Sequence, residues 1–264
     1  MNRVRALGWG VALDDVGVNP VSLALIPLLR PDVVKLDASV VAHPPDAATT
    51  ALVSAVAAEA ERTGAVVLAE GIETQEHLAA ARAAGAHLGQ GWLFGRPAPE
   101  PPTWMETGTP KHGIRVDLTP TTSPARTPYA LAAAARSTWR ANGTMLCALC
   151  RHLEGQAAVM GDGVIVLTTF QRAAAFGPVS ARYADLAAHA AFITVFGVGM
   201  GPEPAPGVKG VDLDPEDLLA PEWDLVVLGS HFSALLTARP AAGEAPAAGR
   251  ATPSTTTCSA MTAP

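Results

Sequence analysis

The chain has 264 residues, which suits one large domain or two small ones. Hydrophobic residues make up 49% of it, enough for buried cores, and its net charge of −6 does not favour binding to a nucleic-acid polymer. Three cysteines give no disulfide framework. No signal peptide is recognisable, and the apolar runs are shorter than the roughly 20 residues of a membrane span. We therefore expect a cytoplasmic protein without a membrane partner.

The first hundred residues alternate predicted strands with predicted helices. Gly8 and Gly64 are placed to end the helices that precede them. The strands are expected at residues 9–13, 33–36, 66–69 and around 89–94, and the helices at residues 2–8, 21–29, 47–63 and after residue 74. This alternation is typical of a parallel α/β sheet with about four strand–helix units.

Three of these strands run into charged side chains. Asp14 and Asp15 follow the first strand, Lys35 and Asp37 lie at the end of the second, and Glu70 ends the third. In parallel α/β folds, the carboxyl ends of the strands are where ligand chemistry is placed. The sequence therefore predicts one shared site at this edge of the sheet.

Four ordered motifs carry a family resemblance: residues 13–17 (LDDVG), 34–37 (VKLD), 69–74 (AEGIET) and 90–97 (QGWLFGRP). They resemble the later motifs of the EAL domain, a bacterial domain that hydrolyses cyclic di-GMP to linear pGpG on a TIM-like barrel. The resemblance implies an α/β fold for residues 1–97, a partial TIM-like (β/α) barrel. Either the chain is a fragment of a longer reading frame, which we favour, or it is a true half-barrel with exposed strand edges.

The resemblance also implies roles for individual residues. Asp14 and Asp15 would be metal ligands in a two-metal site for Mg²⁺ or Mn²⁺, hard cations that prefer carboxylate oxygens. Glu70 would be the general base, and Lys35 would contact the phosphate or the attacking water. Gln90 would hydrogen-bond the nucleotide.

Apart from Glu70, these residues also have plainer interpretations. An Asp-Asp pair before a glycine is common in turns, and a lone lysine is often a surface residue whose stem lies on apolar neighbours. Lys35 is, however, the only lysine among the first hundred residues. Gln90 could instead bond backbone groups of its loop.

Two further acids have structural interpretations, and one loop departs from the family. Asp37 could cap the segment after it, and Glu73 could lie at the start of the next helix. Residues 18–23 read VNPVSL, where the family usually has Thr-Gly-Tyr-Ser-Ser-Leu. In the family this loop couples metal binding to dimerisation, so both metal binding and a possible homodimer are in question.

The rest of the chain divides into three segments. Residues 98–127 are rich in proline and threonine and are predicted to be a linker. Residues 128–239 are predicted to form a second α/β domain, with helices at 129–141, 145–153 and 178–190 and strands at 164–170, 192–198 and 223–228. Residues 240–264 hold few large apolar side chains, and we expect this tail to be disordered.

The second domain resembles the DICT sensory domain along residues 177–187, 194–197, 206–211 and 223–229. This resemblance implies a smaller α/β sensory domain, with a possible signalling partner and an unknown signal. Cys147 and Cys150 lie one turn apart on a predicted helix and are assigned to packing. His189 and His231 have no spaced partner and are likewise assigned to packing or the surface.

The sequence as a whole indicates a cyclic di-GMP signalling protein. One hypothesis is an EAL-type phosphodiesterase that is active in a full-length form and inactive as this chain. The alternative is a sensory or interaction module without catalysis. The feature that separates them is the metal shell, since three acids leave each cation short of protein oxygens.

Overall fold

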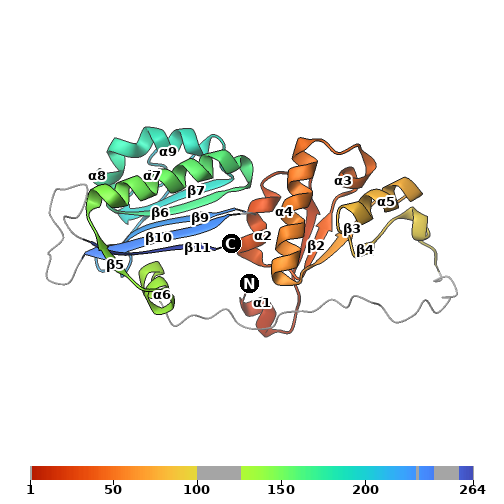
Figure 1. Ribbon diagram of the computed structural model, residues 1–264, viewed down its shortest axis with the longest axis horizontal. Coiled ribbons are helices and arrows are strands. Elements are labelled where there is room, and N and C mark those ends of the chain that lie inside the picture. The colour runs from red at the N-terminus through yellow and green to blue at the C-terminus, as the bar shows by residue number, and fades with distance from the viewer. Residues whose placement is uncertain (1, 100–125, 230–231, 241–255, 264) are drawn as a thin grey trace. The chain divides into compact units, whose positions relative to one another are not determined.

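The computed structural model describes residues 2–99, 126–229, 232–240 and 256–263, without the side chains of Asn2 and of residues 256–263. It divides into two compact units, residues 1–121 and 122–264, each with its own sheet (Figure 1). The division falls inside the predicted linker at 98–127, of which residues 100–125 lie outside the described residues.

The first unit is a parallel α/β structure. Its four strands are β1 (Ala12–Val16), β2 (Val33–Leu36), β3 (Val66–Ala69) and β4 (Leu88–Gly89), in the spatial order β1-β2-β3-β4. Its helices are α1 (Asn2–Ala6), α2 (Ser22–Leu29), α3 (Ala38–Ala42), α4 (Ala47–Thr63), α5 (Gln75–Ala83) and the 3-10 helix η1 (Trp92–Phe94). The α/β class is confirmed, and over the described residues the sheet is open, with β1 and β4 at its edges.

Local chemistry explains where the helices of this unit begin and end. The Asp46 carboxylate accepts a 2.7 Å hydrogen bond from the Thr49 N–H and so begins α4. Gly64 ends α4 in the left-handed conformation, with φ of 75°. The Thr74 hydroxyl accepts a 3.1 Å bond from the His77 N–H at the start of α5. The predicted helix at 47–63 and strands at 33–36 and 66–69 are confirmed.

Apolar side chains from both layers fill the core of the first unit. They come from the sheet and from the helix faces that cover it: Leu13, Val16, Ile26, Val34, Leu36, Leu52, Val56 and Val67. Burying a side chain of this size contributes roughly 1.5–3 kcal/mol to folding. A buried ion pair joins Arg5 of α1 to Asp32 before β2, at 3.2 Å, and Asp32 also accepts a 2.7 Å bond from the Val11 N–H.

The second unit contains a mixed seven-stranded sheet in the order β5-β11-β10-β9-β6-β7-β8. The strands are β5 (Trp139–Ala141), β6 (Ile165–Arg172), β7 (Phe192–Val198), β8 (Lys209–Asp212), β9 (Trp223–Leu228), β10 (Ser233–Pro240) and β11 (Thr256–Ala263). Strands β6, β7 and β8 pair in parallel, and the remaining pairs are antiparallel.

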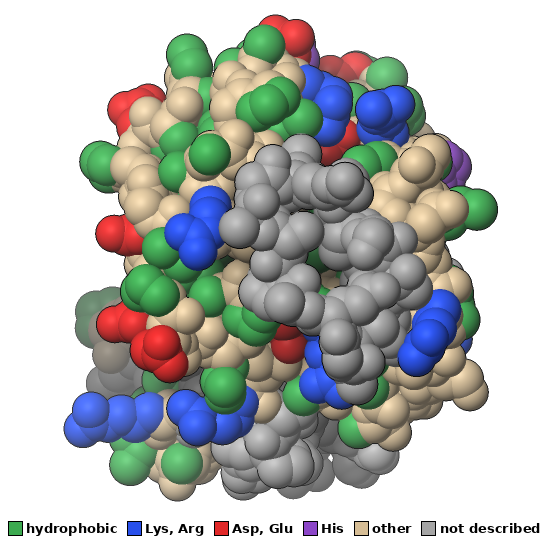
Figure 2. Space-filling view, turned by 90° about the vertical axis from the view of Figure 1, so that its left-hand side faces the viewer, with side chains coloured by type: hydrophobic (Ala, Val, Ile, Leu, Met, Phe, Trp, Pro, Cys, Tyr) green, Lys and Arg blue, Asp and Glu red, His purple; other side chains and the backbone are tan. Residues whose placement is uncertain are grey.

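Helices cover one face of this sheet. They are α7 (Gly143–Met160), α8 (Ala173–Phe176) and α9 (Ser180–Ala187) (Figure 1). A further helix, α6 (Pro128–Ala135), packs separately against β10 and β11. Short 3-10 turns lie at η2 (Gly161–Gly163) and η3 (Gly177–Val179). On the face of this unit seen in Figure 2, described side chains of both charges lie among hydrophobic ones.

Two predictions in the first unit were wrong in detail. The first strand runs from Ala12 to Val16 rather than over 9–13, because the backbone keeps pairing with β2 beyond the two aspartates. The last strand is limited to Leu88–Gly89 and gives way to η1, since the Leu93 N–H turns back to the Ile72 carbonyl at 3.0 Å.

Two predictions in the second unit differ from the structure because of strand pairing. The helix expected at 129–141 ends at Ala135, and residues 139–141 form β5, which pairs with β11. Residues 256–263 of the tail expected to be disordered form β11, which pairs along the whole length of β10. Pairing between segments so far apart in the sequence overrides local propensity. Residues 241–255 lie outside the described residues.

Candidate functional site

The candidate site is built on an irregularity in β1. Leu13 pairs with Val34 and Val16 pairs with Leu36, so Asp14 and Asp15 lie together opposite one residue of β2. This arrangement is a β-bulge, and such bulges re-aim side chains at strand ends. Asp15 takes the left-handed conformation, with φ of 54°, which aspartate tolerates better than most residues. The bulge therefore keeps two consecutive carboxylates at the same edge of the sheet.

The residue opposite the bulge is Lys35, and it connects neighbouring strands. Its Nζ lies 2.6 Å from Asp14 Oδ1 and 2.7 Å from Glu70 Oε1. Glu70 follows β3 directly, and its N–H donates a 3.0 Å bond to the Leu36 carbonyl. Lys35 and Glu70 are each about a quarter exposed, and Asp14 is mostly exposed. The site is thus open to solvent on the β1 side.

The three acids come close enough together to bind one cation. One carboxylate oxygen each of Asp14, Asp15 and Glu70 lies within 4.8 Å of the others. Hydrogen bonding to Asp14 and Glu70 raises the pKa of Lys35, and the Lys35 hydrogen bond lowers the pKa of Asp14. Lys35 therefore stays cationic and Asp14 stays anionic at neutral pH.

This set of donors fits a hard divalent cation. Carboxylate oxygens are the ligands that Mg²⁺ and Mn²⁺ prefer. If each acid offers one ligand oxygen, the three acids fill only part of an octahedral shell of six, so one ion bound here would need water or substrate oxygens as well. The described residues form no other such group of acids, histidines and cysteines.

Gln90 lies at the end of the neighbouring strand β4. Its N–H donates a 2.9 Å bond to the Ala69 carbonyl, and its carbonyl accepts a 3.0 Å bond from the Ile72 N–H. The Gln90 side chain is exposed. These backbone bonds hold Gln90 beside β3, which leads into Glu70. The next residue must be glycine for the chain to pass so close to Ile72, because a Cβ on Gly91 would lie 2.2 Å from the Ile72 carbonyl oxygen.

Two predicted structural roles for acids can be compared with the fold. Asp37 begins α3 by accepting a 2.8 Å bond from the Ser39 N–H, and bonds from Ser39 lower the pKa of Asp37. It is thus a helix cap, as the alternative interpretation predicted. Glu73 immediately precedes Thr74, which is the residue that caps α5.

Two cysteines of the second unit lie on α7, and the structure adds a cavity beside them. Cys150 is buried and Cys147 half-buried on α7, and both are free thiols. They also line a cavity with Glu154 and Arg182, which the sequence analysis missed. The signal was available, since residues 147, 150, 151 and 154 recur at helical spacing on one face. His231 lies outside the described residues.

The fold and the acidic site together define an α/β domain with a carboxylate cluster at the strand ends, joined to a second sheet-containing unit. Comparison with known families agrees with this description. The EAL domain model matches residues 1–97, and the model of the DICT domain, described as a sensory domain in diguanylate cyclases and two-component systems, matches residues 129–240. The two resemblances stated from the motifs are confirmed.

Curated relatives match a little over a third of this chain. A probable cyclic di-GMP phosphodiesterase of Escherichia coli, PdeD, is 35% identical over 103 residues, which are 38% of this chain and 19% of that protein. The cyclic di-GMP phosphodiesterase NbdA of Pseudomonas aeruginosa is 36% identical over 100 residues, 38% of this chain and 13% of that protein. The chain thus spans less than a fifth of the length of either relative.

One solved structure is also similar in sequence. It is the EAL enzyme Bd1971 in its cGMP-bound form, with 33% identity over 36% of this chain and 26% of that chain, and a TM-score of 0.32.

Within the described residues, no helix combines the length and the apolar character needed to cross a bilayer.

Proposed function

We propose that this chain takes part in cyclic di-GMP signalling, and that the carboxyl ends of β1, β2 and β3 bind the phosphodiester of that nucleotide. The observation that carries the proposal is the cluster in which Asp14, Asp15 and Glu70 converge within 4.8 Å beside Lys35. The names of the similar proteins PdeD and NbdA, both cyclic di-GMP phosphodiesterases, support the choice of nucleotide.

The residues of the cluster divide the chemistry among them. Asp14 and Asp15 would hold a divalent cation, Mg²⁺ or Mn²⁺, which when bound would polarise a phosphoryl oxygen and acidify water. In a full-length form with a complete metal shell, Glu70 would accept a proton from the attacking water, for which a carboxylate within hydrogen-bond reach is required. Lys35 is held cationic by Asp14 and Glu70, so it faces the phosphate as a fixed positive charge. Gln90 donates a hydrogen bond from its exposed amide to the nucleotide.

A second candidate function is a non-catalytic sensory or interaction module. It is favoured by the balance of charge in the site, where the Lys35 ammonium already contacts two of the three carboxylates. A cation bound by the remaining oxygens alone has an incomplete shell. We therefore propose that this chain by itself binds the nucleotide in the presence of metal but does not turn it over. A homodimer and a protein partner of residues 128–239 remain predictions.

The experiment uses the whole 264-residue chain with cyclic di-GMP, in Mn²⁺ or in EDTA. Nucleotide binding is measured by equilibrium dialysis, and pGpG formation by chromatography. We expect binding in Mn²⁺ that falls about tenfold or more in EDTA and in the double variant Asp14→Asn/Asp15→Asn, since each lost charge-assisted contact is worth roughly 1.5–3 kcal/mol. Glu61→Gln is the matched control, because Glu61 is an exposed acid on α4 away from the strand ends.

The outcomes separate the two candidate functions. Steady pGpG formation in Mn²⁺, abolished by Asp14→Asn, would show that the chain is itself a phosphodiesterase. Absence of nucleotide binding under both conditions would refute the nucleotide site and leave the interaction module.

A further inference from the structure

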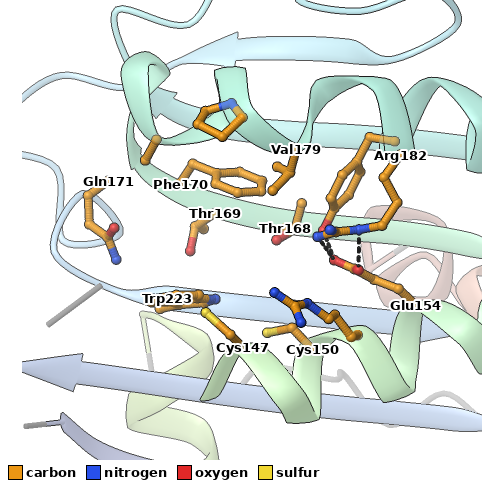
Figure 3. Close-up of a pocket in the computed structure, with 14 residues that line it drawn as sticks. Cys147, Cys150, Glu154, Thr168, Thr169, Phe170, Gln171, Val179, Arg182 and Trp223 are labelled. Atoms are coloured by element: carbon orange, nitrogen blue, oxygen red, sulfur yellow. Dashed lines mark hydrogen bonds and ion pairs between the residues drawn. The ribbon is translucent and has the colours of Figure 1, made fainter. Parts of the chain in front are cut away.

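The second unit contains a cavity of about 130 Å³ between helix α7 and the α8–α9 segment (Figure 3). Its floor comes from the sheet, where Thr168, Thr169 and Phe170 of β6 and Trp223 of β9 line it. Cys147, Cys150 and Glu154 face it from α7. None of the residues of the acidic cluster lines it, so it is a separate site.

Aromatic and aliphatic side chains form most of the cavity wall. The rings of Phe170 and Tyr183 meet edge to face with centroids 5.7 Å apart, and Val179 and Trp223 line the same space (Figure 3). An apolar cavity of roughly 150 Å³ is known to hold one benzene molecule. A cavity of about 130 Å³ therefore has room for a single six-membered ring and little more.

The thiols belong to the apolar part of the cavity. Burial raises the pKa of Cys150 to about 12, so this thiol is protonated at neutral pH. A protonated, buried thiol is neither a good nucleophile nor a metal ligand, and it packs as a small apolar group. The cavity is therefore suited to reversible binding of an organic molecule.

The lining of the cavity carries an excess of positive charge. The buried Glu154 carboxylate accepts a 2.7 Å hydrogen bond from the Tyr183 hydroxyl and pairs with Arg182 Nε at 2.8 Å. This pairing fixes the Arg182 side chain, which lines the cavity and is about half exposed. Arg151 also lines the cavity and is exposed. Two guanidinium groups against one carboxylate leave one positive charge for an anionic ligand group.

We propose that this cavity binds a small monocyclic aromatic carboxylate. Its ring lies between Phe170 and Trp223, and its carboxylate meets Arg151 and Arg182. The description of the matched family as a sensory domain names no ligand. The proposal does not depend on the nucleotide chemistry proposed for the first unit.

The test uses the whole chain and 4-fluorobenzoate, with binding followed by the ¹⁹F line width. We expect 4-fluorobenzoate to bind about tenfold more tightly than 4-fluorobenzyl alcohol, because only the carboxylate meets the arginines. Arg151→Gln should remove this difference and leave the affinity for the alcohol unchanged. Arg151 is exposed, so its replacement leaves the fold intact.

A second pair of variants tests the location. Ala175 lines the cavity and Ala174, its neighbour on α8, is exposed. Ala175→Leu should fill the cavity and abolish binding, while Ala174→Leu should bind as the parent does. The proposal is overturned if neither probe binds, if the neutral alcohol binds as tightly as the carboxylate, or if Ala175→Leu binds normally.

Discussion

The Nζ of Lys35 lies 2.6 Å from Oδ1 of Asp14, which is on the neighbouring parallel strand. The two residues are brought together by the bulge in β1, which places Asp14 and Asp15 opposite Lys35. Their contact raises the pKa of Lys35 and lowers that of Asp14. A carboxyl group whose pKa is lowered on folding contributes stability above its unfolded pKa and loses it in acid. The pair is therefore intact at neutral pH.

Replacing Lys35 tests whether its charge competes with a bound cation. Lys35→Met removes one positive charge and keeps the unbranched stem, so Mn²⁺ should bind about three- to tenfold more tightly by electron paramagnetic resonance titration. Cyclic di-GMP should bind more weakly, because its phosphate loses a cation. Arg82→Met on α5, which removes an exposed charge outside the cluster, is the control. Weaker Mn²⁺ binding in Lys35→Met would contradict this account.

Gly71 supports the position of Glu70. It has a left-handed φ of 65°, and a Cβ there would lie 2.3 Å from Ala38 Cβ. Gly85 has φ of 79° and open space where a Cβ would lie, so it is a matched control. Gly85→Ala should lower the free energy of unfolding by about 1 kcal/mol, because alanine strains the left-handed backbone. Gly71→Ala should lower it by about 1–3 kcal/mol more, because its Cβ also collides with Ala38. Hydrogen exchange of the β3 amides measures both, and equal losses would exclude the collision.

Asp224 makes the stability of the second unit depend on pH. Burial raises the pKa of its carboxyl to about 7, with nearby Glu222 adding to the effect. The folded unit thus holds a proton that the unfolded chain has lost, so the stabilisation is complete below the unfolded pKa of 3.8 and is lost as the pH rises through 7. Between pH 5 and pH 8 we expect a loss of roughly 2–3 kcal/mol.

The measurement is the exchange-derived free energy of opening for β9, corrected for intrinsic rates, at pH 5 and pH 8. Asp224→Asn keeps the shape of the side chain and should flatten this dependence. Asp185→Asn, at an exposed position on α9, should leave it unchanged. A parental stability that rises with pH over this range would refute the assignment.

Glu222 connects the cavity to the start of the second unit. Its carboxylate accepts bonds from the Thr127 hydroxyl at 2.6 Å and the Tyr129 N–H at 3.1 Å, and its carbonyl accepts one from Thr169, which lines the cavity. Glu222→Leu should leave two donors at the start of α6 without this acceptor. Each buried donor left unpaired should lower the free energy of unfolding by about 1–3 kcal/mol.

The measurement for Glu222→Leu is hydrogen exchange in α6, which should accelerate about tenfold or more. Glu216→Leu, which makes the same replacement at an exposed acid before β9, is the control. Unchanged exchange in α6 would show that Glu222 does not hold its first turn.

The sequence alone was sufficient for the elements with strong local signals. Helix α4 could be placed at 47–63 because of its helical pattern and because Gly64 permits the left-handed end; the Asp46 cap at its start emerged from the structure. The apolar runs of β2 and β3 were equally clear, and charged residues at the ends of three strands, among them Asp14, Lys35 and Glu70, indicated a shared site. Each of the two family resemblances rested on short motifs, and the residues within a motif are consecutive in the chain.

Tertiary structure decided what depends on pairing between distant segments. The bulge that sets Asp14 and Asp15 opposite Lys35 follows from the register of β1 on β2, which the side-chain pattern of β1 does not specify. Strands β5 and β11 likewise form through pairing, since β11 pairs with β5 on one side and with β10 on the other. The raised pKa of Asp224 comes from burial under residues scattered along the chain. Local sequence encodes propensity and caps, whereas register, burial and cavities are properties of the assembled sheets.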